Sequence, residues 1–422
     1  MRCCEVDYLY MKDGYKMTDI GLIPMDWKVA PIKNYITKIS RRNRDDSICD
    51  VVSVTKHDGI VDSKTYFNNQ VFSNDLTTYK IIRKGEFAYP PIHINEGSIG
   101  YLQHLQQAVL SPMYTVFSIN TLLINHYYLF SILKSHFYIQ LYCTFIKGSV
   151  ERRGAVSFEE FSNIEVPLPP LPEQQKIADI LSTVDEHISE TESLIEKTKV
   201  LKQGMMQHLL TKGIGHTEFK DTEIGRIPVE WEVIPVGKYI KNVSRKNRDG
   251  LVTDVVSVTK HNGIVDSMSY FKNQVYSDNL TTYKIVRRDE FAFPPIHLNE
   301  GSIGYLEHIE QAVLSPMYTV FSVNKCFLDN YFLFGLLKSH KYIDIYSTFI
   351  EGTVERRGAV SFDKFSGIKI PLPPLPEQKK ITSILTSIDD QNDSYNTKLT
   401  SLTKLKSALM QQLLTGRTRV KI

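Results

Sequence analysis

Two long stretches of the chain carry apolar residues at near-heptad spacing. In the first, which opens at Glu173 and ends at Gly213, these residues are Ile177, Leu181, Val184, Ile188, Ile195, Leu201, Met205 and Leu209. In the second they are Ile381, Leu385, Ile388, Tyr395, Leu399, Leu402, Leu409 and Leu413. The spacing predicts two long helices, each with an apolar seam that needs a partner. A helix of about 38 residues is roughly 55–60 Å long, so we expect the two helices to pair antiparallel between two globular heads.

A proline-rich strap precedes each predicted helix. The run VPLPPLP (166–172) cannot be helical inside, because each proline removes a backbone donor and holds the preceding residue extended. The sequence PLPPLPEQ stands before both helices. One seam position differs in kind, since Ile188 corresponds to Asn392. A lone polar seam residue can fix the register of a helix pair, or it can lie at a solvated edge, and both interpretations of Asn392 stay open.

Upstream of each strap the pattern changes to short β-rich runs separated by Gly, Pro and Asn. In the first copy these runs cover residues 51–55, 86–92, 98–103 and 109–118. Their composition predicts strands and turns. From residue 125 to about 142 the apolar residues recur at three-to-four spacing, which predicts one core helix that closes the domain.

The chain contains one unit written twice, at a constant shift of 204 residues from Thr18 to Thr415. From Asp50 to Ser118 the two copies are identical at 54 of 69 positions, against 11 of 35 from Ile177 to Thr211. Drift after a duplication, in which exposed helix tolerates change better than a packed domain, and a functional cause both account for this unevenness.

The predicted fold class is α+β, with two repeated mixed α/β domains joined by two long antiparallel coiled-coil helices in a pseudo-twofold arrangement. The expected boundaries are an N-terminal tail (1–17), a first domain (18–172), a central spacer helix (173–213), a second domain (214–376), and a C-terminal spacer helix with a tail (377–422).

Composition indicates the number of domains and the cellular compartment, but it does not identify the partner. A length of 422 residues with 42% apolar content is enough for two or three domains. A formal charge of +3 neither demands nor excludes nucleic acid. The five cysteines show no paired spacing apart from Cys3 and Cys4, which is typical of a reducing compartment. We find no signal-peptide pattern and no apolar run of about 18 residues, so we expect a cytoplasmic protein without a membrane partner.

Motifs of common enzymes are absent from the sequence. It has no GxxxxGK[ST] loop, no GxGxxG after a strand, no HExxH and no GxSxG. Tyr89-Pro90-Pro91-Ile92 and Phe293-Pro294-Pro295-Ile296 superficially resemble the Asn/Asp-Pro-Pro-aromatic motif of adenine methyltransferases, but both lack the polar first residue. We interpret them as rigid turns, with catalysis a minor alternative.

Local basic clusters are the candidate DNA-binding residues, because Lys and Arg supply affinity at phosphates while directed side chains read base edges. In the first copy they are Arg41, Arg42 and Arg44 around Asn43, then Lys56 and His57, then Lys80, Arg83 and Lys84, then Arg152 and Arg153 beside Lys147. In the second copy they are Arg245, Lys246 and Arg248 around Asn247, then Lys260 and His261, then Lys284, Arg287 and Arg288, then Arg356 and Arg357, with Glu351 replacing Lys147. Taken singly, each cluster is better explained as solvated surface or an ion pair, and their joint recurrence favours DNA. His93 and His297 are either base readers or structural histidines.

Three features together resemble the specificity subunit of type I restriction-modification systems. They are an IPxxW start (Trp27 and Trp231), the PLPPLPEQ strap opening a long helix, and the helix ends MMQHLLTKG and LMQQLLTGR. The resemblance covers nearly the whole chain in both copies, and the repeated strap with its helix is the most specific part. Residues 1–14 have no counterpart in that pattern.

The resemblance implies two target recognition domains, each gripping half of a split site in double-stranded DNA. The paired helices would act as a ruler and as the docking surface for two adenine methyltransferase modification subunits, which bring S-adenosylmethionine. It also allows for restriction subunits with motor and nuclease activity. This chain would then be non-catalytic and hold no cofactor.

Near-identical heads predict near-identical half-sites, and hence an inverted-repeat target. The substitutions that matter most are Asp58 to Asn262, Lys64 to Met268 and Gly85 to Asp289. Two rival hypotheses are a DNA-modifying enzyme with an unfamiliar site, which would cut or methylate DNA unaided, and a scaffold whose heads bind protein.

Overall fold

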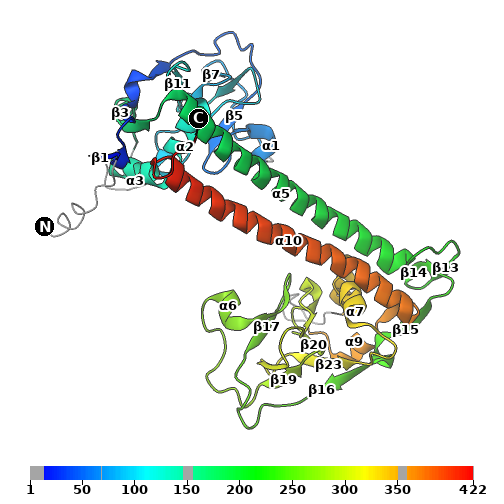
Figure 1. Cartoon of the computed structure of the whole chain (residues 1–422). Helices are drawn as coiled ribbons and strands as arrows, with labels where there is room; N and C mark the ends of the chain where they lie inside the picture. Colours follow the sequence, from blue (N-terminus) through cyan, green and yellow to red (C-terminus); the bar gives the residue numbers. More distant parts are fainter. Residues whose placement is uncertain (1–13, 68, 146–154, 350–358, 422) are drawn as a thin grey trace. The chain divides into compact units, whose positions relative to one another are not determined.

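The computed structural model describes residues 14–67, 69–145, 155–349 and 359–421. The chain divides into two compact units, Met1–Glu192 with Thr397–Ile422, and Ser193–Asn396. Each unit holds one strand-rich head, the N-terminal part of one long helix and the C-terminal part of the other. The long helices α5 (Leu171–Lys212) and α10 (Leu375–Leu413) therefore each contribute to both units (Figure 1).

The first head is an assembly of small antiparallel sheets. Its strands are β1 (Tyr15–Thr18), β2 (Gly21–Pro24), β3 (Lys28–Pro31), β4 (Ile36–Ile39), β5 (Val52–Thr55), β6 (Gly59–Asp62), β7 (Lys80–Arg83), β8 (Phe87–Tyr89), β9 (Gly100–Tyr101), β10 (Gln107–Leu110), β11 (Thr115–Ile119) and β12 (Glu165–Leu168). The central sheet has the order β4-β11-β8-β9, and the pairs β1-β2, β3-β12, β5-β6 and β7-β10 surround it. Gly100 permits a close approach of β9 to the hairpin formed by β5 and β6, because a Cβ added at Gly100 would lie 2.7 Å from the backbone nitrogen of Ile60 on β6.

Short helices complete the first head, namely α1 (Ser63–Phe67), α2 (His126–Leu133), α3 (His136–Phe145) and α4 (Phe158–Ser162), with 3-10 turns at Ile32–Asn34 and Ile94–Glu96. Asn125 begins α2 by accepting a hydrogen bond from the backbone of Tyr128. The single helix predicted for 125–142 is in fact two. The chain turns at Ser135, whose N–H donates to the carbonyl of Ile132, and the hydroxyl of Tyr142 donates to the carbonyl of Leu133 that the break leaves free.

The second head repeats this plan. Its strands are β13 (Phe219–Thr222), β14 (Gly225–Pro228), β15 (Glu232–Pro235), β16 (Ile240–Val243), β17 (Val256–Thr259), β18 (Gly263–Asp266), β19 (Lys284–Arg287), β20 (Phe291–Phe293), β21 (Gly304–Tyr305), β22 (Gln311–Leu314), β23 (Thr319–Val323) and β24 (Lys369–Leu372). Its short helices are α6 (Ser267–Phe271), α7 (Asn330–Leu337), α8 (His340–Thr348) and α9 (Phe362–Ser366), with 3-10 turns at Val236–Lys238 and Leu298–Glu300. The sheet order β16-β23-β20-β21 matches that of the first head.

Two other predicted elements differ in extent from the prediction. The strand predicted for 109–118 is two strands, β10 and β11, separated by a turn in which the N–H of Tyr114 donates to the carbonyl of Ser111. Pro112 cannot donate to a ladder, which accounts for the interruption. The proline-rich strap is extended only as far as Leu168, in β12, and α5 already begins at Leu171 because Pro172 is tolerated in a first helical turn.

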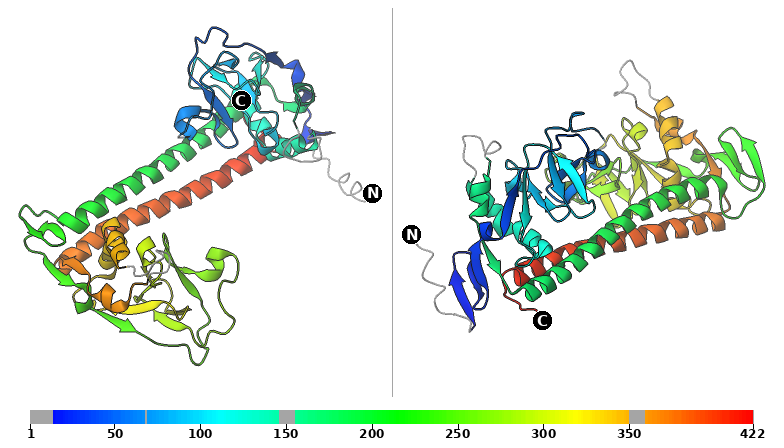
Figure 2. Two further views of the ribbon diagram at one scale, coloured as in Figure 1. Left: turned by 180° about the vertical axis from the view of Figure 1, so that it is seen from behind. Right: turned by 90° about the horizontal axis from the view of Figure 1, so that it is seen from above.

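The long helices pack antiparallel within each unit (Figure 2). In the first unit Ile177 and Leu181 near the start of α5 share a core with Leu413 near the end of α10 and with Trp27 of the head. In the second unit the corresponding core joins the end of α5 to the start of α10 and to Trp231. The predicted fold class is therefore confirmed, with two repeated mixed α/β domains and two long packed helices.

The seam follows a stricter heptad than the apolar residues alone suggested. Thr198 is buried and Lys202 half-buried, whereas Leu201, which we placed in the seam, is exposed. The pattern was hidden because Thr and Lys occupy seam positions. Asn392 is half-buried, and its Oδ1 atom is buried without a hydrogen-bond partner among the described residues, which favours a seam position over a solvated edge.

Candidate nucleic-acid interface

A cluster of like charges lies where the loop after β4 meets β7. Arg42 and Lys80 pair their backbones in an isolated antiparallel bridge, and the Nζ of Lys80 donates to the carbonyl of Tyr114. Burial lowers the pKa of Lys80, and the nearby cations Lys38 and Arg42 lower it further. A bound anion would relieve this repulsion, so the cluster suits a DNA phosphate.

The second head builds the same cluster from Lys246 and Lys284. Their backbones form the equivalent bridge, and the Nζ of Lys284 lies 2.6 Å from the carbonyl oxygen of Tyr318. Burial and then Lys246 lower the pKa of Lys284. Lys38 has no cationic counterpart, because Asn242 occupies that position. Both heads thus carry a pair of cations at the same two positions, Arg42 with Lys80 and Lys246 with Lys284.

Arg41 and Arg245 differ from their neighbours because each is ion-paired within its head. Arg41 pairs with Glu86, and Arg245 pairs with Glu290. The same glutamates also accept the backbone N–H of Arg83 and of Arg287. These two arginines stabilise the turn after β7 and β19, and their charge is already compensated.

The loop after β4 exposes one further arginine in each head. Asn43 is fully buried and holds the loop, since its Nδ2 donates to the carbonyl of Ile48 and its Oδ1 accepts the N–H of the same residue. Asn247 does the same for Val252. The asparagines that we grouped with the basic residues are therefore structural, whereas Arg44 and Arg248 are exposed beside them.

The β5–β6 turn exposes Lys56 and His57, and the β17–β18 turn exposes Lys260 and His261. The backbone of the turn is held by a lysine of the same head: the Nζ of Lys134, the residue that caps the C-terminus of α2, donates to the carbonyl of His57 at 3.1 Å. Lys338 contacts the carbonyl of Lys260 in the same way. Burial lowers the pKa of both lysines to about 8. The backbone of each turn is therefore held in place by a hydrogen bond, while the side chains of Lys56 and His57, and of Lys260 and His261, are exposed.

The remaining predicted cations divide between the two heads. Arg83 and Arg287 end β7 and β19 and are exposed, as is Lys84. Arg288 lies 3.0 Å from Glu310, whereas the first head has Gln106 in place of that glutamate. The last predicted cluster, Arg152 and Arg153 beside Lys147 and Arg356 and Arg357 beside Glu351, lies outside the described residues.

The aromatic residue that begins each motif resembling that of methyltransferases belongs to the core. Tyr89 is fully buried and its ring packs on Phe161, while Phe293 packs on Phe365. The Nδ1 of His93 lies 3.1 Å from Glu96, and His297 pairs with Glu300 at the same distance. Within the described residues, no group of three or more His, Cys, Asp or Glu side chains could hold a metal ion.

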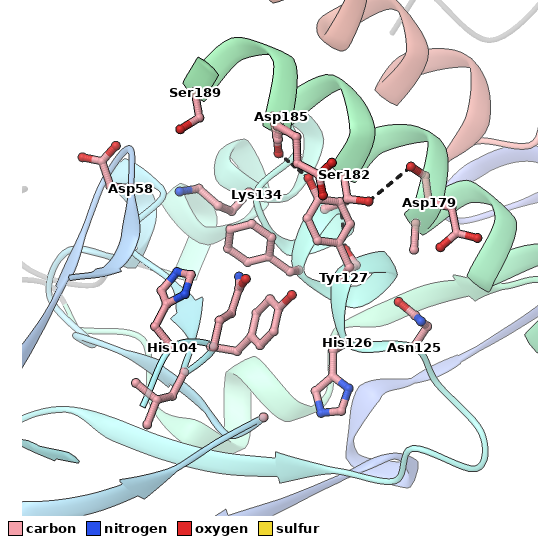
Figure 3. Close-up of a pocket in the computed structure, with 18 of the residues that line it drawn as sticks. Asp58, His104, Asn125, His126, Tyr127, Lys134, Asp179, Ser182, Asp185 and Ser189 are labelled. Carbon is pink, nitrogen blue, oxygen red and sulfur yellow. Dashed lines mark hydrogen bonds between the residues drawn. The ribbon is translucent and has the colours of Figure 1, made fainter. Parts of the chain in front are cut away.

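A pocket of about 1380 Å³ lies in the first unit between the head and the long helices (Figure 3). Asp179, Glu186 and Glu192 of α5 line one wall together with Asp185. The wall is tied to its surroundings at Asp185, which accepts the hydroxyl of Tyr127 on α2 and pairs with Lys406 on α10 at 2.5 Å. An acidic wall repels a phosphate backbone, so this pocket suits a cationic protein segment better than DNA.

The second unit repeats that polar triad. The hydroxyl of Tyr331 on α7 donates to Asp389 on α10, and Lys202 on α5 lies 2.5 Å from the same carboxylate. In both units the triad joins the head to one long helix and that helix to the other. The orientation of each head on its helices is therefore set by hydrogen bonds as well as by apolar packing.

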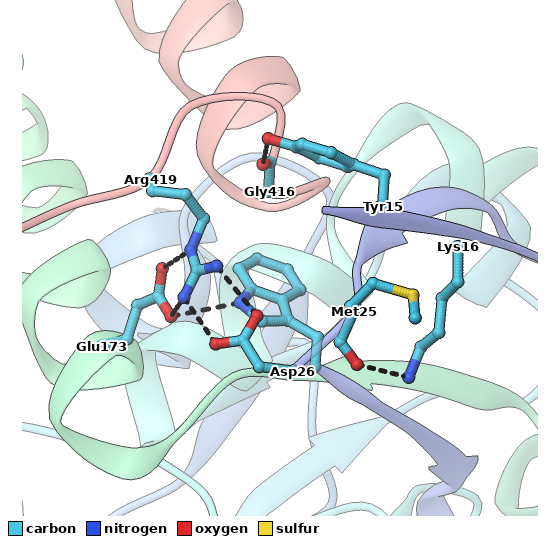
Figure 4. A network of polar contacts seen from close by, with 8 residues as sticks. Tyr15, Lys16, Met25, Asp26, Glu173, Gly416 and Arg419 are labelled. Atoms are coloured by element: carbon cyan, nitrogen blue, oxygen red, sulfur yellow. Dashed lines mark hydrogen bonds and ion pairs between the residues drawn. The ribbon is translucent and has the colours of Figure 1, made fainter. Parts of the chain in front are cut away.

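A buried carboxylate ties the tail after α10 to the first head (Figure 4). The guanidinium of Arg419 donates to Glu173 at 2.7 and 2.9 Å and to both oxygens of Asp26 at 2.8 Å. The hydroxyl of Tyr15 donates to the carbonyl of Gly416. Hydrogen bonding to Arg419 is the largest cause that lowers the pKa of Asp26.

Two features of the surface were missed by the sequence reasoning. Lys38 joins the basic cluster only through the fold, because it stands far from Lys80 in the chain. We did not single out the aromatic pairs Tyr66 with Phe67 and Tyr270 with Phe271 from the sequence, and the structure shows them exposed. Their identity in both copies is a signal, but it becomes meaningful only once their exposure is known.

Comparison with known proteins places this architecture. The family model for the type I restriction modification DNA specificity domain matches residues 30–201 and again 228–404. Among curated proteins, the chain is 28% identical over 445 residues to the putative type I restriction enzyme MjaX specificity subunit of Methanocaldococcus jannaschii, covering 98% of both chains. It is 27% identical over 440 residues to the MjaVIII specificity subunit of the same organism, covering 98% of this chain and 97% of that protein.

Solved structures share the fold. The S subunit of the type I restriction-modification system of M. genitalium matches with a TM-score of 0.54 at 14% identity, covering 98% of this chain and 99% of that one. A chain from a study of complex assembly and conformational transition of the type I R-M system matches with a TM-score of 0.52 at 16% identity, covering 94% and 99%. Fold and repeated domain together define a DNA specificity protein. The chain belongs to the family of type I restriction-modification specificity subunits, which is non-catalytic. No helix among the described residues combines the length and apolar character needed to cross a membrane.

Proposed function

We propose that each head reads one half of a bipartite target in double-stranded DNA and that this chain thereby directs a type I restriction-modification complex. The observation that carries the proposal is the cation cluster around Lys80, which recurs around Lys284 in the second head. Membership of the family supports a role in DNA specificity. The repeated cation cluster supports a binding place for phosphates in each head.

Within each head we assign the duplex to the surface that carries Lys and Arg side chains without a carboxylate partner among the described residues, together with the histidine of the hairpin turn. On the first head these residues are Arg42, Arg44, Lys56, Lys80 and Arg83 with His57, and on the second Lys246, Arg248, Lys260, Lys284 and Arg287 with His261. Arg41, Arg245 and Arg288 are engaged with carboxylates, so we assign them structural roles. Lys84 and His57 both line the acidic pocket and are weaker candidates.

Because the two heads keep the same cations and the same core, we propose that the half-sites form an inverted repeat around an unspecified spacer. The domain boundaries predicted above belong to this proposal, with the two long helices as spacers between recognition domains.

The acidic wall of α5 and the helix pair itself are the proposed docking surfaces for two adenine methyltransferase subunits. Acidic side chains recur at the matching place on α10, at Asp389, Asp390 and Asp393. Such a surface complements a cationic segment of a partner protein. This role also implies a cytoplasmic location, where the chromosomal DNA lies, and it allows for restriction subunits.

The test uses the complex of this chain with its modification subunits and compares the double variant Arg42→Ala/Lys246→Ala with Lys197→Ala, an exposed lysine on α5. If each removed cation contacts one phosphate, the plot of log affinity against log salt becomes less steep by about 1.8, at about 0.9 per phosphate. The control keeps the wild-type slope. An unchanged slope in the double variant, or lost assembly with unchanged DNA affinity, favours the scaffold hypothesis instead.

A further inference from the structure

Both heads keep large apolar side chains exposed at one place on the surface. Tyr66 is 46% exposed and Tyr270 44%, while Phe67 is 39% exposed and Phe271 42%. Adjacent exposed aromatic side chains are costly to leave in water, and together they offer an apolar surface to a ligand.

These aromatic residues form one surface with the neighbouring hairpin turn. The hydroxyl of Tyr66 on α1 donates to Oδ2 of Asp58 in the β5–β6 turn at 3.0 Å. The rings of Tyr66 and Phe67 meet edge to face with centroids 5.0 Å apart, as do those of the second head. We call the surface made by Lys56, His57, Asp58, Lys64, Tyr66 and Phe67, and by their counterparts Lys260, His261, Asn262, Met268, Tyr270 and Phe271, the tip patch.

The tip patch shares Lys56 and His57, the exposed residues of the β5–β6 turn, with the surface assigned above to DNA. Figure 3 shows Asp58 at the tip of its hairpin, across the pocket from Asn125 and His126. Of the first head's patch, only His57 and Asp58 line the acidic pocket. The other residues of this patch, among them the exposed Lys56 and Lys64, are not part of the pocket lining. An apolar and cationic surface of this kind fits a DNA groove, where apolar groups contact the thymine methyl and cations contact phosphates.

Two positions of the described tip patch differ between the heads. Asp58 is replaced by Asn262, and Lys64 by Met268. The remaining patch residues are identical, and Thr65 and Ser269 make the same hydrogen bond to the preceding aspartate. A carboxylate only accepts hydrogen bonds, whereas an amide both donates and accepts. The chemistry offered to a base edge therefore changes at one point of an otherwise constant surface.

The third conspicuous difference, Gly85 against Asp289, is compensated inside its own head. At Gly85 an added Cβ would lie 2.8 Å from the Nε2 of His126. In the second head Asn330 replaces His126 and donates to the carbonyl oxygen of Asp289, and Lys325 pairs with the aspartate side chain. These changes repack one corner, and they engage the carboxylate of Asp289 and the amide nitrogen of Asn330 within the head.

We propose that Asp58 and Asn262 are the specificity-determining residues at which the two half-sites differ, with Lys64 and Met268 adjusting the same contact. This inference rests on the proposed function. Asp58 has one oxygen engaged by Tyr66 and one left to accept the amino group of a cytosine, whereas Asn262 can pair with an adenine through donor and acceptor together. The target is then an inverted repeat with one departure from symmetry.

The experiment determines the methylated motif by single-molecule sequencing of DNA modified by the assembled complex. The variant Asp58→Asn/Lys64→Met gives the first head the tip patch of the second, so both half-sites acquire the second head's base. The reciprocal variant Asn262→Asp/Met268→Lys gives the opposite change. At the altered position we expect the base preference to shift by about tenfold or more, the discrimination of one good base contact.

The control is Gly85→Asp/Thr121→Lys/His126→Asn, which transplants the compensated corner and is expected to leave the motif unchanged. If the double variant assembles poorly, Asp58→Asn alone repeats the test with a nearly isosteric change. A perfectly symmetric wild-type motif, or persistent methylation with an unchanged motif in both swaps, overturns the inference and leaves the proposed function standing. A wild-type motif that is not bipartite overturns both.

Discussion

The indole Nε1 of Trp27 donates to Oε2 of Glu173 at 3.1 Å, and the same bond joins Trp231 to Glu377 at 3.0 Å. The third member of the site differs, since Arg419 from the tail after α10 completes it in the first unit, whereas His216 after α5 does so in the second. The segment that follows each long helix therefore completes the head packed at that end. Arg419, which follows α10, is part of the first head's structure.

We expect Arg419→Ala to weaken the first unit selectively. Glu173 is fully buried and would lose its cationic partner, at a cost of about 1–3 kcal/mol for a buried acceptor left partly unsatisfied. Hydrogen exchange, which reports local opening, should show faster exchange in β1 to β3 and unchanged protection in β13 to β15. Arg417→Ala, two residues away and exposed, serves as the control. Equal loss of protection in both units would contradict this assignment.

A second prediction concerns the seam of α5. Leu181→Ala removes a fully buried side chain from the core that also contains Trp27 and Leu413, and should cost about 2–4 kcal/mol. Leu201→Ala, at an exposed position, should cost less than about 0.5 kcal/mol. Denaturant unfolding of the two variants provides the comparison. Similar losses would mean that Leu201 lies in the seam after all.

The long helices and the head architecture could be predicted because their signals are periodic and local. Heptad spacing and the repeat of 204 residues predicted the α+β plan with its packed helices. The break at Ser135 could not be predicted, because the carbonyl of Leu133 that it leaves free is bonded by the hydroxyl of Tyr142 on the next helix. The seam positions of Thr198 and Lys202 were hidden because both residues are polar. The hydroxyl of Thr198 donates to the carbonyl of Leu194 on the same helix, and Lys202 pairs with Asp389 on α10.

Candidate site residues were harder to rank from sequence than to find. Arg41 and Arg42 are adjacent in the chain, yet one is ion-paired to Glu86 and the other faces Lys80. That difference arises from strand pairing, which brings together residues about 40 positions apart. Likewise Tyr66 has a large aromatic side chain that could equally lie in a core, and only the fold shows that it is exposed.

The two turn-supporting lysines predict a pH dependence of stability. Burial lowers the pKa of Lys134 and of Lys338 to about 8, from 10.5 in the unfolded chain. Between these values the unfolded state binds more protons, so stability rises as pH increases from about 8. Buried tyrosines such as Tyr101, whose pKa burial raises to about 12, oppose this above about pH 10.

The measurement is the free energy of unfolding between about pH 8 and 9.5 for the wild type and for Lys134→Met/Lys338→Met. The methionines keep the aliphatic contacts but remove both protons, so the rise with pH should become flatter. Lys197→Met, exposed on α5, should keep the wild-type slope. A slope that does not change in the double variant would show that these lysines keep their charge when the chain folds.

The central claim is that two like heads read two like half-sites through the same face. The most direct measurement is the sequence motif methylated by the wild-type complex, read from modified DNA at single-molecule resolution. We predict two short half-sites in inverted orientation, separated by an unspecified spacer and matching at all but one position. Two half-sites with unrelated sequences, or a single uninterrupted motif, would contradict the account.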